Sequence, residues 1–132
     1  MKYLLDTNIC IHFLRGNFNL SEKFAKEDPQ NFAISEITYA ELVFGAENSN
    51  NPEKNTKLVE QFIEVIKVVP VYNSIRKYAK EKVRLRKEGK MISDFDLLIA
   101  CTAVENNLIM VTENVREFER VTDIKIENWI DR

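Results

Sequence analysis

Three acidic residues, far apart in the sequence, could together form one metal site. Asp6 directly follows the short apolar run Tyr3-Leu4-Leu5 and precedes a segment with the pattern of a helix. Open parallel sheets build their sites at such positions, where a strand ends and a helix begins. Glu41 and Asp96 lie in helical segments that are otherwise mostly apolar. Because oxygen ligands without a His or Cys cluster suit a hard cation, the set predicts bound Mg²⁺ or Mn²⁺.

Glu41 gives the strongest signal of the three acids. A carboxylate with apolar neighbours loses solvation, which is costly unless a charge or strong hydrogen-bond donors compensate. No Lys or Arg occurs from residue 27 to residue 53, so the partner must be distant in sequence or a metal ion. The apolar residues that we expect on the same helical face are Ile37, Ala40, Phe44 and Gly45.

The other two acids can also be interpreted as helix caps. Asp is a favoured N-cap residue, so Asp6 could accept hydrogen bonds from backbone N–H groups of its own helix. Ser93 and Asp96 fit a capping box, in which Asp96 would reach back to the Ser93 backbone. Asp94 would then only favour the positive end of the helix dipole. These alternatives stay open, but capping alone does not explain all three acids.

A polar turn after the apolar segment 108–111 adds Asn114 to the candidates. Its side chain is either a helix cap or an amide whose carbonyl orients a metal-bound water. His12 is the only histidine, and no Ser or Cys is well placed as a nucleophile. A catalytic triad or a His-based acid–base pair is therefore disfavoured, and we expect His12 to have no chemical role.

Short apolar segments alternate with helical segments along the chain, which predicts an α/β fold with a largely parallel sheet. Right-handed crossovers would place helices on both faces of that sheet. Asp6, Ser35 and Asn114 each follow a strand, so they should meet at its carboxyl edge. Glu41 and Asp96 would join them through the packing of their helices. The expected strands cover residues 2–5, 32–34, 68–71, 108–111 and 124–126, and the expected helices cover residues 8–15, 20–27, 36–48, 53–66, 74–89, 94–106 and 115–120.

Composition indicates an ordinary globular protein. With 132 residues, 45% of them apolar and 30% charged, the chain is one domain over residues 1–132 that can bury a core. Cys10 and Cys101 lie in apolar surroundings without CxxC spacing, which indicates buried thiols in a reducing compartment. No apolar run approaches the roughly 18 residues of a membrane span, and the early acid excludes a signal peptide. We therefore expect a cytoplasmic protein.

Carboxylates gathered on Mg²⁺ usually act on phosphate esters, and a nucleic-acid substrate would also need a cationic surface. The net charge is only −2, but residues 73–90 hold eight basic against two acidic residues, which leaves −8 elsewhere. This basic helix could follow the phosphates of RNA, with Arg84, Arg86 and Lys87 as candidate contacts. Alternatively, it is a solvated face or docks an acidic protein, while an apolar stripe packs inward. That stripe is Ile75, Tyr78, Ala79 and Val83.

The chain resembles a PIN domain, and within that family a VapC-type toxin ribonuclease. The matching stretches occur in family order along the whole chain and are Leu5-Asp6-Thr7-Asn8, Ile37-Thr38-Tyr39-Ala40-Glu41-Leu42, Asp96-Leu97-Leu98-Ile99-Ala100, Val111-Thr112-Glu113-Asn114 and Ile126-Glu127-Asn128-Trp129. The resemblance implies a three-layer α/β/α sandwich and a Mg²⁺- or Mn²⁺-dependent endoribonuclease that cleaves structured RNA, especially tRNA or rRNA.

The resemblance also assigns roles to single residues. It implies that Asp6, Glu41 and Asp96 bind the metal and that Thr112 helps to hold water in the metal's shell. A fourth family acid is replaced here by Asn114, which puts a second metal ion in question. It further implies a homodimer and a cognate antitoxin that covers the site.

Other interpretations fit less well. An enzyme of the haloacid-dehalogenase type needs a second Asp two residues after the first, and Asn8 stands there. A receiver domain needs paired acids after its first strand, where only Asp6 occurs. DNA nucleases of PIN-like fold use larger acidic sets. The non-enzyme alternative is a PIN-like scaffold that binds RNA or protein and whose acids are structural.

Overall fold

The computed structural model describes residues 1–132, and its centre is a five-stranded sheet in which all neighbouring strands are parallel. The strand order is β3-β2-β1-β4-β5, so β1 is the middle strand. Parallel strands need long crossovers, and helices supply them here. The strands are β1 (Tyr3–Leu5), β2 (Phe32–Ser35), β3 (Lys67–Val69), β4 (Ile109–Val111) and β5 (Ile126–Glu127).

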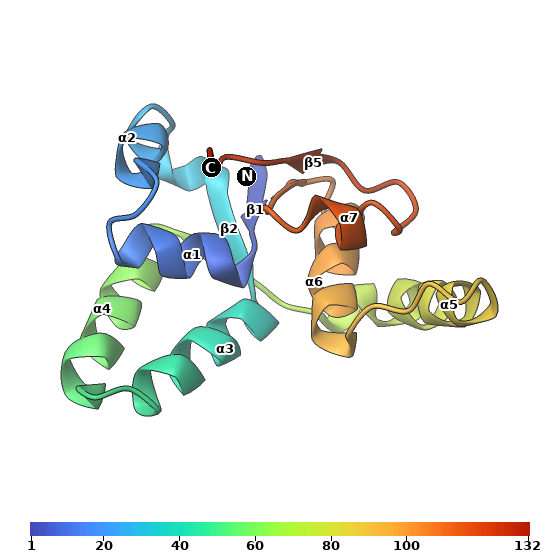
Figure 1. The fold of residues 1–132 in the computed structure, drawn as a ribbon, viewed down its shortest axis with the longest axis horizontal. Coiled ribbons are helices and arrows are strands. Elements are labelled where there is room, and N and C mark those ends of the chain that lie inside the picture. The colour runs from blue at the N-terminus through green and yellow to red at the C-terminus, as the bar shows by residue number, and fades with distance from the viewer.

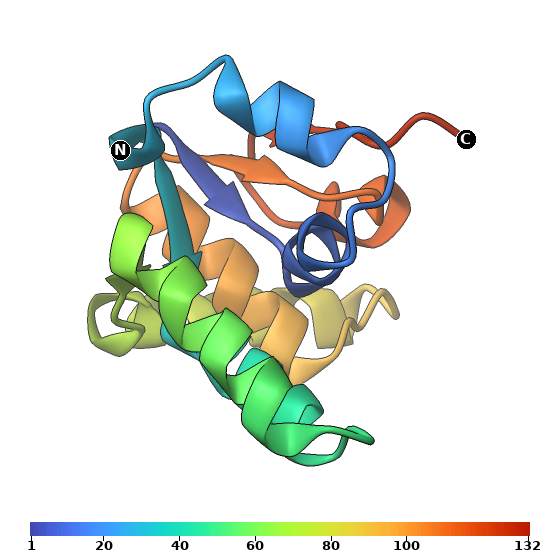
Figure 2. The same cartoon turned by 90° about the vertical axis from the view of Figure 1, so that its left-hand side faces the viewer.

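Helices cover both faces of this sheet, with α1 to α4 on one side and α5 and α6 on the other (Figures 1 and 2). None of them is both long and apolar enough to cross a lipid bilayer. The helices are α1 (Thr7–Leu14), α2 (Leu20–Ala25), α3 (Glu36–Glu47), α4 (Pro52–Val65), α5 (Ile75–Lys87), α6 (Asp94–Glu105) and α7 (Val115–Phe118), with 3-10 turns η1 (Pro29–Asn31) and η2 (Tyr72–Ser74).

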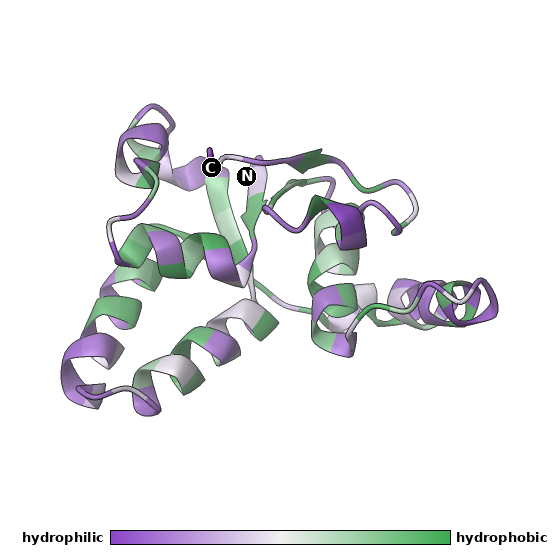
Figure 3. Ribbon diagram, in the orientation of Figure 1, coloured by the Kyte–Doolittle hydropathy of each residue, from purple (hydrophilic) through white to green (hydrophobic).

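Two apolar cores flank the sheet because neighbouring side chains of a strand point to opposite faces. On β1, Tyr3 and Leu5 join the core under α1 to α4, whereas Leu4 joins the core under α5 and α6. The first core is rich in aromatic rings, including Phe13 and Phe24, which stack with centroids 4.4 Å apart. Figure 3 shows the contrast between the apolar strands and the largely hydrophilic α5. These cores fix the carboxyl end of β1, which Asp6 follows, and the first turn of α6, which holds Asp96.

The predicted α/β fold with a parallel sheet and helices on both faces is confirmed. All five strands differ from their expected bounds by at least one residue, and β3 and β5 differ most. β3 ends at Val69 because Pro70 has no N–H to donate to the ladder, and β5 covers Ile126–Glu127, later than expected.

The predicted packing face of α5 is wrong for three of its four residues, because only Tyr78 is partly buried against the core. Ile75 is 48% and Val83 53% exposed, and Ala79 is exposed too. The buried side chains of this helix are Glu81 and Leu85. The stripe is exposed because α5 packs on α6 and extends away from the sheet (Figure 1). Its first turn also lacks the expected side-chain cap.

Candidate active site

Asp6 lies at the carboxyl end of the middle strand β1 and is the N-cap residue of α1. The residue is only 6% exposed. Its Oδ1 accepts a hydrogen bond from the backbone N–H of Thr7, and its Oδ2 accepts one from the hydroxyl of Thr112, both at 2.8 Å. Each carboxylate oxygen can accept more than one bond. Capping and metal binding by Asp6 are therefore compatible.

Burial raises the pKa of Asp6 from its ordinary value of 3.8 to about 6. The hydrogen bonds from Thr112 and Thr7 oppose this shift, while the negative charges of Asp96 and Glu41 add to it. No basic side chain lies within ion-pair distance of any of the three acids. Buried negative charge without a basic partner fits the binding of a cation.

Glu41 extends from the middle of α3, and its Oε1 accepts a hydrogen bond from the hydroxyl of Thr7 at 2.7 Å. The predicted apolar surroundings of Glu41 are wrong, because it is half-buried and Phe44, one turn later, is 69% exposed. The helix is apolar on most sides, so its sequence does not show which face is buried. The buried residues are Thr38, Leu42 and Ala46.

Asp96 lies in the first turn of α6 and forms only half of the expected capping box. Its backbone N–H donates to the hydroxyl of Ser93 at 3.2 Å, and no hydrogen bond joins its carboxylate to the Ser93 backbone. Burial raises the pKa of Asp96, the Ser93 hydroxyl opposes the shift, and the charge of Glu117 adds to it. No basic side chain pairs with this carboxylate, so it can bind a cation.

Glu117 is a fourth acid of this neighbourhood that was not predicted from the sequence. It lies on the single-turn helix α7, which contacts α6, and is half-buried. The available signal was its place one turn after Asn114. By contrast, Asp94 accepts bonds from Tyr78 and Lys82 of α5, and Lys82 lowers its pKa. Asp94 therefore ties α6 to α5.

Thr112 and Asn114 lie together at the end of β4. The Thr112 hydroxyl is fully buried and, besides donating to Asp6, accepts the backbone N–H of Asn114 at 3.0 Å. Asn114 occupies the N-cap position of α7, but its side chain makes no capping bond. Its amide is therefore available to a ligand or a water molecule. The His12 ring packs against Phe18, and its Nε2 lies 3.5 Å from Oε1 of Glu113.

The predicted acids lie near one another, since Asp6 interacts with the charges of Asp96 and Glu41. Their side chains do not, however, form a complete metal site. No three Asp, Glu, His or Cys side chains are close enough to hold a metal ion as they stand. Carboxylates without a compensating charge repel one another, which favours such spacing. The donors are all oxygens, and Glu41 and Asp96 are only partly buried, so their side chains have room to turn. The residues therefore fit a hard cation in chemistry.

The three predicted RNA contacts differ in their surroundings. Arg84 donates to Oε2 of Glu81 and to the backbone carbonyl of Arg120, both at 2.6 Å. Glu81 is only 4% exposed, so this guanidinium balances a buried carboxylate. Arg86 and Lys87 are exposed and form no ion pair. Their contact with RNA stays a prediction.

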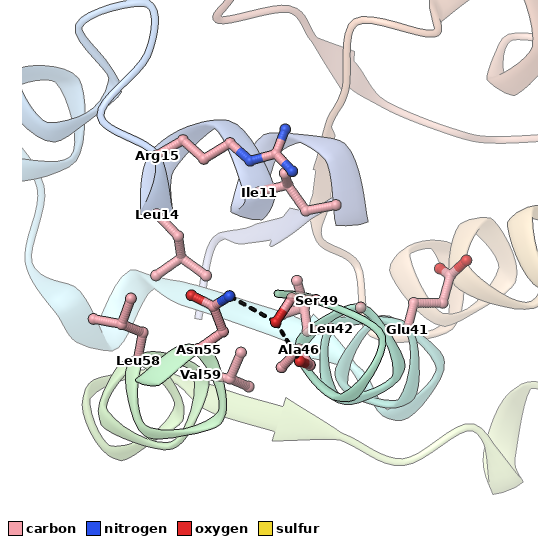
Figure 4. Close-up of a pocket in the computed structure, with 11 residues that line it drawn as sticks. Ile11, Leu14, Arg15, Glu41, Leu42, Ala46, Ser49, Asn55, Leu58 and Val59 are labelled. Atoms are coloured by element: carbon pink, nitrogen blue, oxygen red, sulfur yellow. Dashed lines mark hydrogen bonds between the residues drawn. The ribbon is translucent and has the colours of Figure 1, made fainter. Parts of the chain in front are cut away.

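An apolar groove of about 180 Å³ lies beside the acids, between α1, α3 and α4. Figure 4 shows Glu41 at its edge, with its carboxylate pointing away from Leu14 and Leu58. Arg15 lies on the opposite wall, at the end of α1. The remaining lining residues are Ile11, Leu42, Gly45, Ala46, Ser49, Asn55 and Val59.

The parallel sheet and the acids at its carboxyl edge define the class of protein: an α/β domain with an acidic active site. Comparison with known proteins is consistent with this class. The PIN domain family matches residues 3–124. Ribonuclease VapC2 of Haemophilus influenzae is 36% identical over 132 residues, covering 98% of this chain and 99% of the relative. The tRNA(fMet)-specific endonuclease VapC of Shigella flexneri is 35% identical and covers 98% of both chains.

Solved structures have the same fold. A chain in the crystal structure of DNA-bound VapBC from Salmonella typhimurium superposes with a TM-score of 0.91 at 35% identity and covers 98% of each chain. A chain of VapBC-1 from nontypeable Haemophilus influenzae gives a TM-score of 0.86 at 36% identity over 98% of each chain. The chain therefore belongs to the PIN-domain family, and within it to the VapC-type toxin ribonucleases.

Proposed function

We propose that this protein is the toxin of a toxin–antitoxin pair and hydrolyses phosphodiester bonds in structured RNA with the help of Mg²⁺ or Mn²⁺. The observation that carries this proposal is the buried carboxylate of Asp6, without a basic partner, in the field of Glu41 and Asp96. These three acids would hold the ion. When bound, the ion supplies activated water for attack on phosphorus and neutralises charge on the leaving oxygen.

The residues around Asp6 fix its orientation. Thr112 and the Thr7 backbone each bind one carboxylate oxygen, and burial excludes water from that carboxylate. Attraction between a cation and a carboxylate strengthens where water is excluded. Asn114 has a free amide at the same edge, where it would orient a water molecule or the substrate.

The proposed substrate is a structured RNA, and tRNA is the first class to test because one relative is a tRNA(fMet)-specific endonuclease. Ribosomal RNA is the second class. The exposed basic residues Arg86 and Lys87 would contact phosphates at a distance from the acids. Such contacts add affinity without reading sequence. Because both RNA classes are cytoplasmic, the protein would act in the cytoplasm.

A cognate antitoxin would cover the groove and the neighbouring acids. The similar chains belong to VapBC assemblies, which are toxin–antitoxin systems. The groove offers apolar walls with Glu41 at its edge and Arg15 on one wall. It therefore suits a segment that carries apolar side chains and a basic residue for Glu41. Such a segment would compete with the metal and with RNA.

A homodimer is the assembly that we propose, through the exposed apolar stripe of α5. Ile75, Ala79 and Val83 follow one another at spacings of four residues, so they share a face of the helix. Light scattering of Val83→Asp should then give a monomer, whereas Lys57→Asp, at an exposed position of α4 away from this stripe, should remain dimeric. A wild-type monomer at every concentration would contradict the dimer.

The proposed function is tested by incubating purified, antitoxin-free protein with a panel of tRNAs and rRNA fragments. We expect cleavage with Mg²⁺ or Mn²⁺, none with EDTA, and none by Asp6→Asn. The matched control is Asp28→Asn, since Asp28 is an N-cap aspartate far from the acids. Cleavage that survives both EDTA and Asp6→Asn would refute the mechanism. A folded protein that binds no divalent ion and cleaves no RNA would favour the non-catalytic scaffold.

A further inference from the structure

Thr7 connects two of the acids. Its backbone N–H donates to Asp6, while its hydroxyl oxygen lies 2.7 Å from Oε1 of Glu41 and 3.1 Å from the hydroxyl oxygen of Thr38. Thr38 is fully buried on α3, one turn before Glu41. Thr7, the first residue of α1, therefore contacts the carboxylate of Asp6 through its backbone and the carboxylate of Glu41 through its side chain.

The direction of these bonds follows from the number of protons. A hydroxyl donates one hydrogen bond, and an ionised carboxylate only accepts. When Glu41 is ionised, the Thr7 proton must point to Glu41, so the Thr7 oxygen accepts from Thr38. The Thr38 hydroxyl has no other hydrogen-bond partner in the structure. The result is a chain of two hydroxyls that ends on one oxygen of Glu41.

We propose that Thr7 and Thr38 are positioning residues that hold the Glu41 carboxylate toward Asp6 for metal binding. The proposal rests on the proposed function, in which Glu41 is a metal ligand. Glu41 needs such support because it is only half-buried on the open side of α3 and has no basic partner. A free glutamate at this position would sample several rotamers, and fixing one of them costs entropy at each binding event.

The hydroxyls of Thr7 and Thr38 position Glu41 already in the metal-free protein. Since Thr38 is fully buried, its oxygen cannot exchange its bond to Thr7 for bulk water. The hydrogen bond from Thr38 therefore fixes the orientation of the Thr7 hydroxyl, so that Thr7 donates its proton to Glu41. Loss of such outer partners of metal ligands typically lowers metal affinity or activity by about 10–100-fold.

The test is the affinity of antitoxin-free protein for Mn²⁺, measured by calorimetry or electron paramagnetic resonance, in Thr7→Val, Thr7→Ser and Thr38→Val. Valine keeps the shape of threonine but removes the hydroxyl. Thr7→Val should weaken Mn²⁺ binding about tenfold, and Thr7→Ser should restore it. Thr38→Val should weaken binding in the same direction. Thr102→Val is the matched control, because Thr102 is a fully buried threonine whose hydroxyl bonds only Leu98 within α6.

Kinetics separate positioning from a general loss of structure. In Thr7→Val, the Mn²⁺ concentration for half-maximal cleavage should rise about tenfold, while the KM for RNA stays unchanged. Wild-type affinity in Thr7→Val, or an equal loss in Thr7→Ser, would overturn the proposal. If Thr7→Val fails to fold by circular dichroism, unchanged affinity in Thr38→Val would overturn it. Wild-type protein that binds Mn²⁺ but cleaves no RNA would refute the ribonuclease function alone, because the affinities still test the positioning role.

Discussion

The hydroxyl oxygen of Thr112 lies 2.8 Å from Oδ2 of Asp6, although the two residues are 106 positions apart in the sequence. The contact follows from the pairing of β1 with β4, in which Leu5 lies opposite Val111. Asp6 and Thr112, which directly follow β1 and β4, therefore meet at the carboxyl edge of the sheet. Since both side chains are buried, this bond fixes the central carboxylate of the site.

Removal of the Thr112 hydroxyl should therefore impair the site without abolishing the fold. Thr112→Val leaves one oxygen of Asp6 and the Asn114 N–H without a partner, which should cost about 1–3 kcal/mol in the free energy of unfolding. The pKa of Asp6 should rise further, and RNA cleavage should fall at least about tenfold. Denaturant unfolding and cleavage rates measure both effects. Thr112→Ser should keep both near wild type, so equal loss in the two variants would count against this role.

The strand-end rule explains why this part of the site could be predicted from the sequence. Asp6 and Asn114 each follow a short apolar strand, and parallel strands share one carboxyl edge. Glu41 was identified correctly as a neighbour of Asp6, but for a wrong reason, because its helical face is open. Its contact with Thr7 depends on how α3 packs against α1, which no local pattern encodes.

Glu117 and Arg84 show where sequence reasoning was insufficient. Glu117 lies on a helix of one turn, too short for a periodic pattern, and reaches Asp96 only because α7 contacts α6. Arg84 looked like the other basic residues of α5, but it balances Glu81, whose burial depends on the segment after α7. Both cases require tertiary contacts.

Asp6→Asn should stabilise the metal-free protein at neutral pH. The pKa of Asp6 is 3.8 when unperturbed and about 6 in the fold, so the folded state binds the proton more tightly. This contribution to stability is complete below pH 3.8 and is lost as the pH rises through 6. Above that pH the charged carboxylate costs on the order of 1–3 kcal/mol, which Asn avoids.

Denaturant unfolding at pH 4 and pH 7.5 in EDTA measures this effect. The variant should be more stable than wild type at pH 7.5 and close to it at pH 4. Added Mg²⁺ should stabilise the wild type and leave the variant unchanged. A variant that is less stable at pH 7.5 would mean that the Asp6 charge is already compensated inside the protein.

Glu117→Gln should lower the pKa of Asp96, because it removes the negative charge that helps to raise it. NMR titration of the Asp96 carboxyl measures this pKa. The control is Glu119→Gln, an exposed acid at the end of the same helix. If Glu117 also binds the metal ion, Mn²⁺ binding should weaken in Glu117→Gln but stay unchanged in Glu119→Gln. An unchanged pKa of Asp96 would place Glu117 outside the acidic neighbourhood.

The basic residues of α5 should separate into a structural and a binding group. Arg84→Ala leaves the buried Glu81 without its guanidinium and should cost about 1 kcal/mol of stability, since Arg84 is partly exposed. Arg86→Ala with Lys87→Ala should leave the melting temperature unchanged but weaken RNA binding and flatten its salt dependence. Unchanged RNA binding in that double variant would exclude this end of α5 from the RNA path.

The central claim is that Asp6, Glu41 and Asp96 hold one divalent ion at the carboxyl edge of the sheet. The most direct measurement is the anomalous scattering of Mn²⁺ in crystals of the antitoxin-free protein. We expect a peak within about 2.0–2.3 Å of carboxylate oxygens of these residues, absent in crystals of Asp6→Asn. An ordered wild-type site without such a peak at millimolar Mn²⁺, or a peak held by other residues, would contradict the account.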